Sequence, residues 1–146
     1  MKYIRILFLI IFVLGVNVLL GDTFVKILKI NGIKVNAVES SPSPLICGQE
    51  FSLLIHCEAE KDISSLRLKL EIVDPEGKLY FYTKNKEIGL TFPITNGSKF
   101  DLCYDRLTAV FPGQIPGDYV ITCTAESVDS DVIMKVKMKM EVVVPN

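Results

Sequence analysis

The chain has 146 residues, of which 49% are hydrophobic, and its 16 basic and 17 acidic side chains give a net charge of −1. This length is enough for one domain, and the near balance of charge gives no reason to expect nucleic acid or an anionic membrane as the main partner. A domain of this size can bury enough apolar surface to fold without disulfides.

Residues 1–21 have the layout of a secretory signal peptide. A basic start with Lys2 and Arg5 precedes the almost wholly apolar residues 6–20 and a small residue at the expected cleavage point. The alternative is a membrane anchor, but this apolar run of 15 residues is shorter than the ~20 that a helix needs to cross a bilayer. We therefore expect cleavage, which leaves one domain over residues 22–146, secreted or held in an endosomal or lysosomal lumen. Its 14 basic and 17 acidic side chains give a net charge of −3.

Two β-rich runs, 24–30 and 33–38, flank Asn31-Gly32, a dipeptide that favours a tight two-residue turn. Either the runs form a hairpin, or the first is a loose lead-in segment and the second is the first core strand. The lysine-rich first run alternates poorly, which favours the lead-in segment. The serine- and proline-rich residues 40–44 then form an irregular connection, since proline removes a backbone donor and restricts its predecessor.

From residue 48 onwards, apolar and polar side chains alternate with a period of two, the pattern of a half-buried strand. Between the runs, Asp74-Pro75-Glu76-Gly77 has the chemistry of a turn, because proline presets φ and glycine accepts a positive φ. The strands expected here cover 48–58, 66–72, 78–83 and 88–92, followed by a long strand or bent pair over 100–110.

The last stretch, 132–144, alternates most regularly. Apolar side chains from Met134 to Val142 fall on one face, and three lysines with one glutamate fall on the other. It forms a hairpin with the alternating residues 117–126 through a polar link. Seven or eight strands at spacings near ten residues, with no credible helix in the mature chain, predict an all-β fold: a two-sheet antiparallel immunoglobulin-like β-sandwich.

The single histidine, His56, lies on the polar face of its strand and has no partner at a metal-ligand spacing. Asp101 and Asp105 are close in sequence, but exposed strand faces collect aspartates without catalytic meaning. The sequence contains no Gly-x-Ser-x-Gly motif, phosphate loop or metal-ligand cluster. We therefore expect no enzymatic activity, no cofactor and no bound metal.

Four cysteines, Cys47, Cys57, Cys103 and Cys123, include no Cys-x-x-Cys pair, which argues against a zinc or redox site. In a secreted chain they suggest up to two disulfides. Cys47 and Cys57 stand too far apart along one extended strand to pair. Cys57 with Cys123, both expected to face inward, and Cys103 with Cys123 stay open as pairings.

The residues Asn96-Gly97-Ser98 are both a turn signal and an acceptor sequence for N-glycosylation. In a secreted eukaryotic protein such a turn would be exposed and open to modification. We therefore expect a turn here and regard Asn96 as a candidate glycosylation site.

Three short motifs have counterparts in a known family. In the first, residues 33–35 lead through the proline-rich residues 41–45 to a glycine. The second is residues 92–94 followed by the polar turn 96–98, and the third is Pro-Gly-Asp-Tyr at residues 116–119. Through these motifs, the sequence from about residue 33 to 144 resembles the ML lipid-recognition family. These small secreted β-sandwiches include sterol-transfer, ganglioside-activator, phospholipid-transfer and mite-allergen proteins.

The sequence departs from the family pattern at the terminal disulfide. Phe92 stands where the family usually has a cysteine before proline, and Met134 stands near its usual last-strand cysteine. No cysteine lies in the first mature residues either. The four cysteines present must therefore pair differently or stay partly unpaired.

The resemblance implies a protein that binds or transfers a sterol, fatty acid or phospholipid held between its two sheets. Lipid would then be its partner, with transient membrane contact, and the resemblance identifies no protein receptor. The candidate lipid-binding residues are Phe51, Leu53, Ile55, Leu68, Leu70, Tyr119, Ile121, Met134, Val136 and Met138, with Phe92 and Phe111 near loop edges where they would guard an entrance.

The alternative is an extracellular immunoglobulin-like adhesion or recognition module without a lipid ligand. Cys57 and Cys123 are 66 residues apart, within reach of the two core cysteines of that fold. However, the chain has no tryptophan to pack on such a bridge, and Tyr119 lies four residues before Cys123, whereas a tyrosine corner has two.

Overall fold

The computed structural model describes the backbone of residues 17–20, 23–41, 45–87, 92–107 and 115–145, and the side chains of 25–41, 45–79, 92–104 and 115–145. All regular secondary structure in these ranges is β-strand. The strands are, in chain order, β1 (Asn17–Leu20), β2 (Thr23–Asn31), β3 (Ile33–Ser41), β4 (Leu45–Ile46), β5 (Phe51–Ala59), β6 (Arg67–Val73), β7 (Leu79–Glu87), β8 (Lys99–Leu107), β9 (Gly117–Glu126) and β10 (Ile133–Val143).

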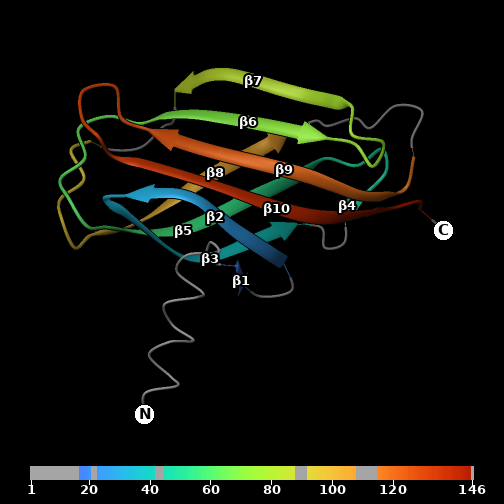
Figure 1. The fold of residues 1–146 in the computed structure, drawn as a ribbon, viewed down its shortest axis with the longest axis horizontal. Coiled ribbons are helices and arrows are strands. Elements are labelled where there is room, and N and C mark those ends of the chain that lie inside the picture. The colour runs from blue at the N-terminus through green and yellow to red at the C-terminus, as the bar shows by residue number, and fades with distance from the viewer. Residues whose placement is uncertain (1–16, 21–22, 42–44, 88–91, 108–114, 146) are drawn as a thin grey trace, which may run out of the picture.

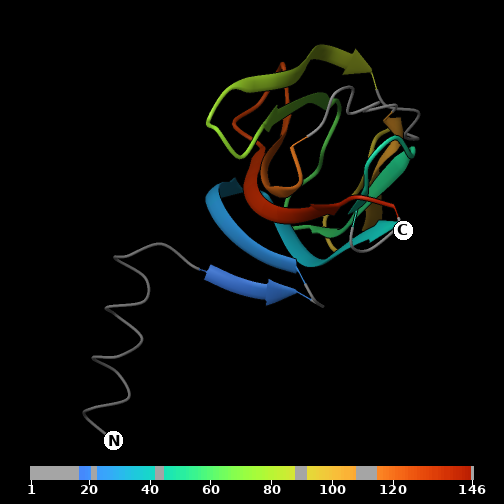
Figure 2. The same ribbon diagram turned by 90° about the vertical axis from the view of Figure 1, so that its right-hand side faces the viewer.

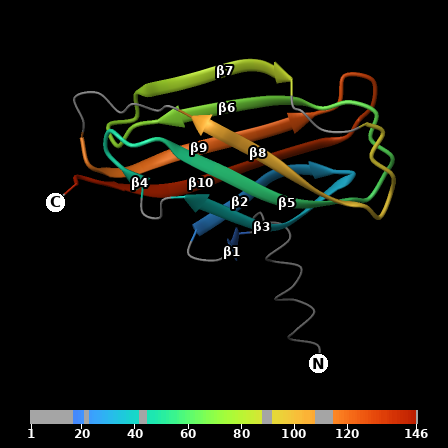
Figure 3. The ribbon, with the colours of Figure 1, turned by 180° about the vertical axis from the view of Figure 1, so that it is seen from behind.

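The strands form two sheets that face each other. The large sheet has the order β1-β2-β10-β9-β6-β7, and the small sheet has the order β3-β5-β8. Figure 1 shows the large sheet in front, Figure 3 shows the small sheet from behind, and Figure 2 shows the two layers from the end. This confirms the all-β sandwich. Eight strands have seven or more residues, and the short β1 and β4 are the additions that sequence periodicity did not indicate.

The strand β4 is unusual because it connects two strands of the small sheet but pairs with the large one. Leu45 and Ile46 lie parallel to Val142 and Val143 of β10, and the Cys47 N–H donates a hydrogen bond of 2.9 Å to the Val143 carbonyl. All the other strand pairs among the described residues are antiparallel. The two layers are therefore fastened to each other where β4 meets β10.

The predicted period of two decides which side chains enter the core. On β10, the five alternate residues from Met134 to Val142 are at most 5% exposed, while Lys135, Lys137 and Lys139 between them are exposed. Strand β5 shows the same alternation from Phe51 to Ala59. Each large apolar side chain buried in this way contributes about 1.5–3 kcal/mol relative to exposure, which holds the facing sheets together.

The prediction that residues 24–30 form a loose lead-in segment is wrong, and so is the hairpin alternative. These residues belong to β2, which pairs with β10, whereas β3 pairs with β5 in the other sheet. The alternation of β2 is poor because Leu28 is an extra residue in a β-bulge: Lys29 pairs with Lys135 but Ile27 pairs with Val136. The Gly32 turn, with φ of 78°, carries the chain from one sheet to the other.

The middle of the chain also differs from its predicted boundaries. Strand β7 continues to Glu87, through the polar residues that were expected to end it. The strand expected over 88–92 falls mostly outside the described residues, and its last residue, Phe92, is not in a strand. Beyond it, Ile63 and Ile94 form an isolated antiparallel bridge, with N–H···O distances of 2.8 and 2.9 Å.

Candidate functional site

The candidate site is the space between the two sheets, where most of the predicted lipid-binding side chains meet. Ten of the predicted residues are 0–3% exposed and lie on the inner faces of β5, β6, β9 and β10. They are Phe51, Leu53, Ile55, Leu68, Leu70, Tyr119, Ile121, Met134, Val136 and Met138. Phe92 is half-buried and packs against this core. Phe111 lies outside the described residues.

Strand register brings large and small side chains together on the inner face of the large sheet. Met138 lies opposite Ile121, while Val136 lies opposite Cys123 and Met134 opposite Ala125. Of the methionines of β10, Met134 therefore borders a much smaller residue of β9, whereas Met138 and Met140 border the large side chains of Ile121 and Tyr119. Because methionine is unbranched and flexible, such a face can repack around an inserted group more readily than one of β-branched residues.

Tyr104 is a core residue that the sequence reasoning missed. It lies on the inner face of β8 with 4% exposure, and its O–H donates a 3.4 Å hydrogen bond to the Thr124 carbonyl of β9 in the opposite sheet. Burial raises the pKa of the phenol well above its ordinary value. Its alternation with buried Leu102 was the signal in the sequence that would have identified it.

The described side chains on the two inner faces are almost all buried. Two hollows lined by described side chains have volumes of about 310 and 240 Å³, but both lie over large-sheet strands and are lined mainly by outward-facing residues rather than by the core. The inner-face side chains instead contact one another in one apolar cluster. A lipid bound between the sheets would lie against these side chains.

The expectation of disulfides is not met, because no bridge joins any of the four cysteines, all of which lie in described parts of the chain. Cys57 and Cys123 are buried on the inner faces of opposite sheets, whereas Cys103 is exposed and Cys47 is half-buried beyond β4. Burial is the main cause that raises the pKa of the Cys57 and Cys123 thiols to about 12. Both thiols therefore stay protonated at neutral pH and act as small apolar core groups.

His56 has partners that its sequence neighbourhood did not reveal. Its Nδ1 lies 2.7 Å from Asp101 Oδ1 on β8, and its Nε2 lies 3.4 Å from Glu39 Oε1 on β3. The hydrogen bond to Asp101 is the main cause that raises the pKa of the imidazole, and Glu39 adds to the effect. Cross-strand register, rather than sequence spacing, creates this cluster. In the described part of the chain, no group of three or more His, Cys, Asp or Glu side chains is arranged to hold a metal ion.

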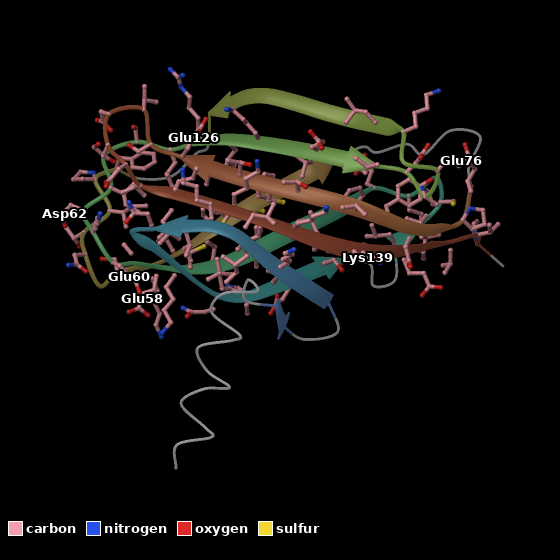
Figure 4. The ribbon with its side chains drawn as sticks, viewed as in Figure 1. Glu58, Glu60, Asp62, Glu76, Glu126 and Lys139 are labelled. Carbon is pink, nitrogen blue, oxygen red and sulfur yellow. The ribbon has the colours of Figure 1, made fainter. Side chains whose placement is uncertain are left out.

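The predicted turn at Asn96 is present and exposed. The Asn96 N–H donates to Asp62 Oδ1 at 2.8 Å, and the Gly97 N–H donates to the Ala59 carbonyl at 2.7 Å. Figure 4 shows Asp62 at one end of the sandwich, with Glu58 and Glu60 near it and Glu76 at the other end. The Asn96 side chain is exposed among the described residues. Its glycosylation stays a prediction.

The architecture is that of an immunoglobulin-like β-sandwich, and it is shared with solved proteins. A Niemann-Pick type C2 protein from the Japanese carpenter ant matches with a TM-score of 0.63 and 14% identity, over 80% of this chain and 97% of that one. The C-terminal domain of wzt matches with a TM-score of 0.52 and 15% identity, over 86% and 80%. The first likeness confirms the resemblance to the ML family at the level of the fold.

Sequence comparison adds no closer relationship. A scan against protein-family models finds no match, and no curated protein sequence matches the chain. Among the described residues, no helix is both long and apolar enough to cross a membrane. The fold and the geometry of the site therefore carry the functional argument.

Proposed function

We propose that this protein binds lipid, holding the apolar part of a sterol, fatty acid or phospholipid between its two sheets and carrying it between membranes. The observation behind the proposal is the methionine-rich inner face of β10, where Met134, Met138 and Met140 are at most 5% exposed. The fold shared with a Niemann-Pick type C2 protein supports it. On this proposal the protein acts in a secreted or lumenal compartment and not as an enzyme.

The energetics favour insertion of a chain into such a core once the sheets separate. Burying apolar surface gains about 0.8 kcal/mol per CH₂, so ten methylenes gain roughly 8 kcal/mol before the cost of repacking. With no disulfide joining the sheets, covalent resistance to separation is low. Separation would also break the 3.4 Å hydrogen bond from Tyr104 to Thr124, so a polar group of the lipid or a water molecule would have to satisfy the Tyr104 hydroxyl.

A binding assay with paired tryptophan variants tests the proposal. Delipidated protein is titrated with a fluorescent fatty acid and a fluorescent sterol, and native mass spectrometry identifies any lipid that copurifies. Ile121→Trp adds bulk to the core and should reduce uptake. Val120→Trp, the matched control at the adjacent outward position of β9, should leave uptake unchanged. Far-UV circular dichroism checks that both variants keep the β-fold.

Two outcomes of this assay would contradict the proposed binding of lipid between the sheets. If folded, delipidated wild-type protein takes up no lipid of any class tried, the proposal is wrong. If Ile121→Trp and Val120→Trp reduce uptake equally while both stay folded, lipid binds somewhere other than between the sheets.

An extracellular recognition module without a lipid ligand is the second candidate. The Tyr119 O–H donates a 3.0 Å hydrogen bond to the Ile115 carbonyl four residues upstream, which resembles the tyrosine corner of immunoglobulin-like domains. On that reading the packed core is structural throughout. Lack of lipid uptake by folded protein would favour it.

A further inference from the structure

The outer face of the large sheet carries a concentration of lysines that the overall charge of the chain conceals. Six lysines lie on this face: Lys26 and Lys29 on β2, Lys69 on β6, and Lys135, Lys137 and Lys139 on β10. We call them the lysine face. Figure 4 shows Lys139 along β10, well away from Glu126 near the end of β9.

Register places these lysines directly against one another. Lys135 pairs with Lys29, and Lys137 pairs with Lys26, on adjacent strands. The Cβ atoms of such partners lie about 5 Å apart, and like charges directly opposite are destabilising. In the described part of the chain, no carboxylate forms an ion pair with any of these four lysines. By contrast, Lys69 forms an ion pair with Glu126, in which Nζ lies 2.5 Å from Oε1. The four apposed lysines therefore have no ion-pair partner among the described residues, and the other carboxylates of this face are Glu71, Glu141 and Asp118.

A hollow of about 310 Å³ lies within this face. It is lined by Lys69, Lys135 and Lys137, by Thr122 and Thr124, by Leu28 and Leu70, and by the single carboxylate Glu71. A second hollow of about 240 Å³, with Lys26, Lys137 and Lys139 among its lining residues, adjoins it at Lys137 and has no carboxylate. Because Lys69 is paired with Glu126, Lys135 and Lys137 supply the positive charge of the first hollow from its β10 side, with Glu71 on β6.

The floor of the hollow supplies hydroxyl groups between the charges. Thr124 lies opposite both Lys135 and Lys69, and Thr122 lies opposite both Lys137 and Glu71. Thr124 is only 9% exposed, and no described residue forms a hydrogen bond with its hydroxyl. A buried hydroxyl without a protein partner is costly, and a ligand that accepts its hydrogen bond removes that cost.

We propose that this hollow binds a phosphate group, whose oxygens accept hydrogen bonds from the Thr122 and Thr124 hydroxyls while Lys135 and Lys137 neutralise its charge. A tetrahedral oxyanion offers several acceptors around one centre, which suits donors that come from the two adjacent strands β9 and β10. The bulge at Leu28 helps form the site, because it breaks the β2 register beside Lys135. This site is independent of lipid binding in the core, from which the large sheet separates it.

Two sources can supply the phosphate: the headgroup of an anionic phospholipid or a soluble phosphate ester. The full mature chain is titrated with inorganic phosphate and inositol hexakisphosphate, following backbone amide shifts by NMR. In parallel, it is mixed with phosphatidylcholine vesicles that contain or lack phosphatidylglycerol. Binding of the soluble anions alone assigns the site to soluble esters, and binding that needs phosphatidylglycerol assigns it to headgroups.

Three variants make the test specific. The double variant Lys135→Gln with Lys137→Gln should weaken phosphate binding at least tenfold. Thr124→Val removes the hydroxyl but keeps shape and charge, and it should weaken phosphate binding several-fold. The matched control is Lys34→Gln with Lys99→Gln, which removes the same charge from exposed positions on the small sheet and should change affinity less than twofold. Wild-type shifts should centre on Thr122, Thr124 and the neighbouring β10 amides.

The proposal fails if neither the soluble anions nor the anionic vesicles bind. It also fails if both lysine pairs weaken binding equally while Thr124→Val has no effect, because binding would then be diffuse electrostatics. Circular dichroism and thermal melts confirm folding of each variant. Since the Lys135/Lys137 change relieves like-charge repulsion, it should not lower the melting temperature.

Discussion

The two outer faces of the sandwich solve the same electrostatic problem differently. On the small sheet, His56 lies between Glu39 and Asp101 of the flanking strands, and Glu58 is opposite both Lys34 and Lys99. On the large sheet, lysine is opposite lysine twice. Both faces belong to one domain with a net charge near zero. The lysines apposed on the large sheet are the observation on which the proposed phosphate site rests.

The largest expected effects should be the same in both sheets, because the contrast is confined to the outer faces. Leu53→Ala in the small sheet and Leu70→Ala in the large sheet each truncate a leucine with no exposed surface. Each should lower the free energy of unfolding by about 2–5 kcal/mol, measured by urea denaturation. Leu54→Ala, the control on the outer face of β5, should cost clearly less. An equal cost at Leu54 would mean that this outer face is also a packing surface.

The small-sheet face should make stability depend on pH through His56. The pKa of the imidazole is raised in the folded state, so its contribution is fully present below the ordinary value of 6.5 and is lost as pH rises through the folded pKa. Because the side chain is 32% exposed, the contribution should stay below about 1 kcal/mol. Thermal melts between pH 5.5 and 9 should show this loss in wild type and much less of it in Asp101→Asn. An unchanged pH profile in the variant would show that Asp101 is not the main partner.

The smallest expected effect has opposite signs on the two faces. Lys135→Glu places a carboxylate opposite Lys29 and should raise the free energy of unfolding at low salt by about 0.2–1 kcal/mol. Lys34→Glu makes the same change opposite Glu58 and should lower it by a similar amount. Both shifts should shrink in high salt, since exposed charges are screened. If the two variants shift stability in the same direction, the contrast between the faces is not electrostatic.

Sequence periodicity was sufficient to predict the sandwich and most of the candidate site. Alternation on β5, β6, β9 and β10 identified the inward side chains correctly, because one residue step moves a side chain to the other face. It failed on β2, where the extra residue Leu28 breaks the alternation. It could not supply the partners of His56, the apposed lysines or Thr124 as a buried hydroxyl, because all of these depend on which strands become neighbours and in which register.

The disulfide pairing of the cysteines also could not be predicted from sequence spacing. Their spacing left two pairings open, and the choice depended on which face and sheet each cysteine occupies. Cys103 faces outward on β8 and Cys123 faces inward on β9, so that pair is separated by the small sheet itself. Cys57 and Cys123 do face the same core, yet they remain unbridged on opposite walls.

The two-residue strand β4 has a mechanical consequence for a protein that must admit a bulky guest. By joining β10 while its chain neighbours lie in the small sheet, it latches the layers together along one edge. The turn at Gly32, where β2 passes directly into β3, ties the layers again on the β2 side. Parting of the sheets should therefore pivot about this fastened side and be widest between β7 and β8, the two strands that end their sheets opposite it. Phe92, on the segment that joins those two strands, would then stand beside the widest gap.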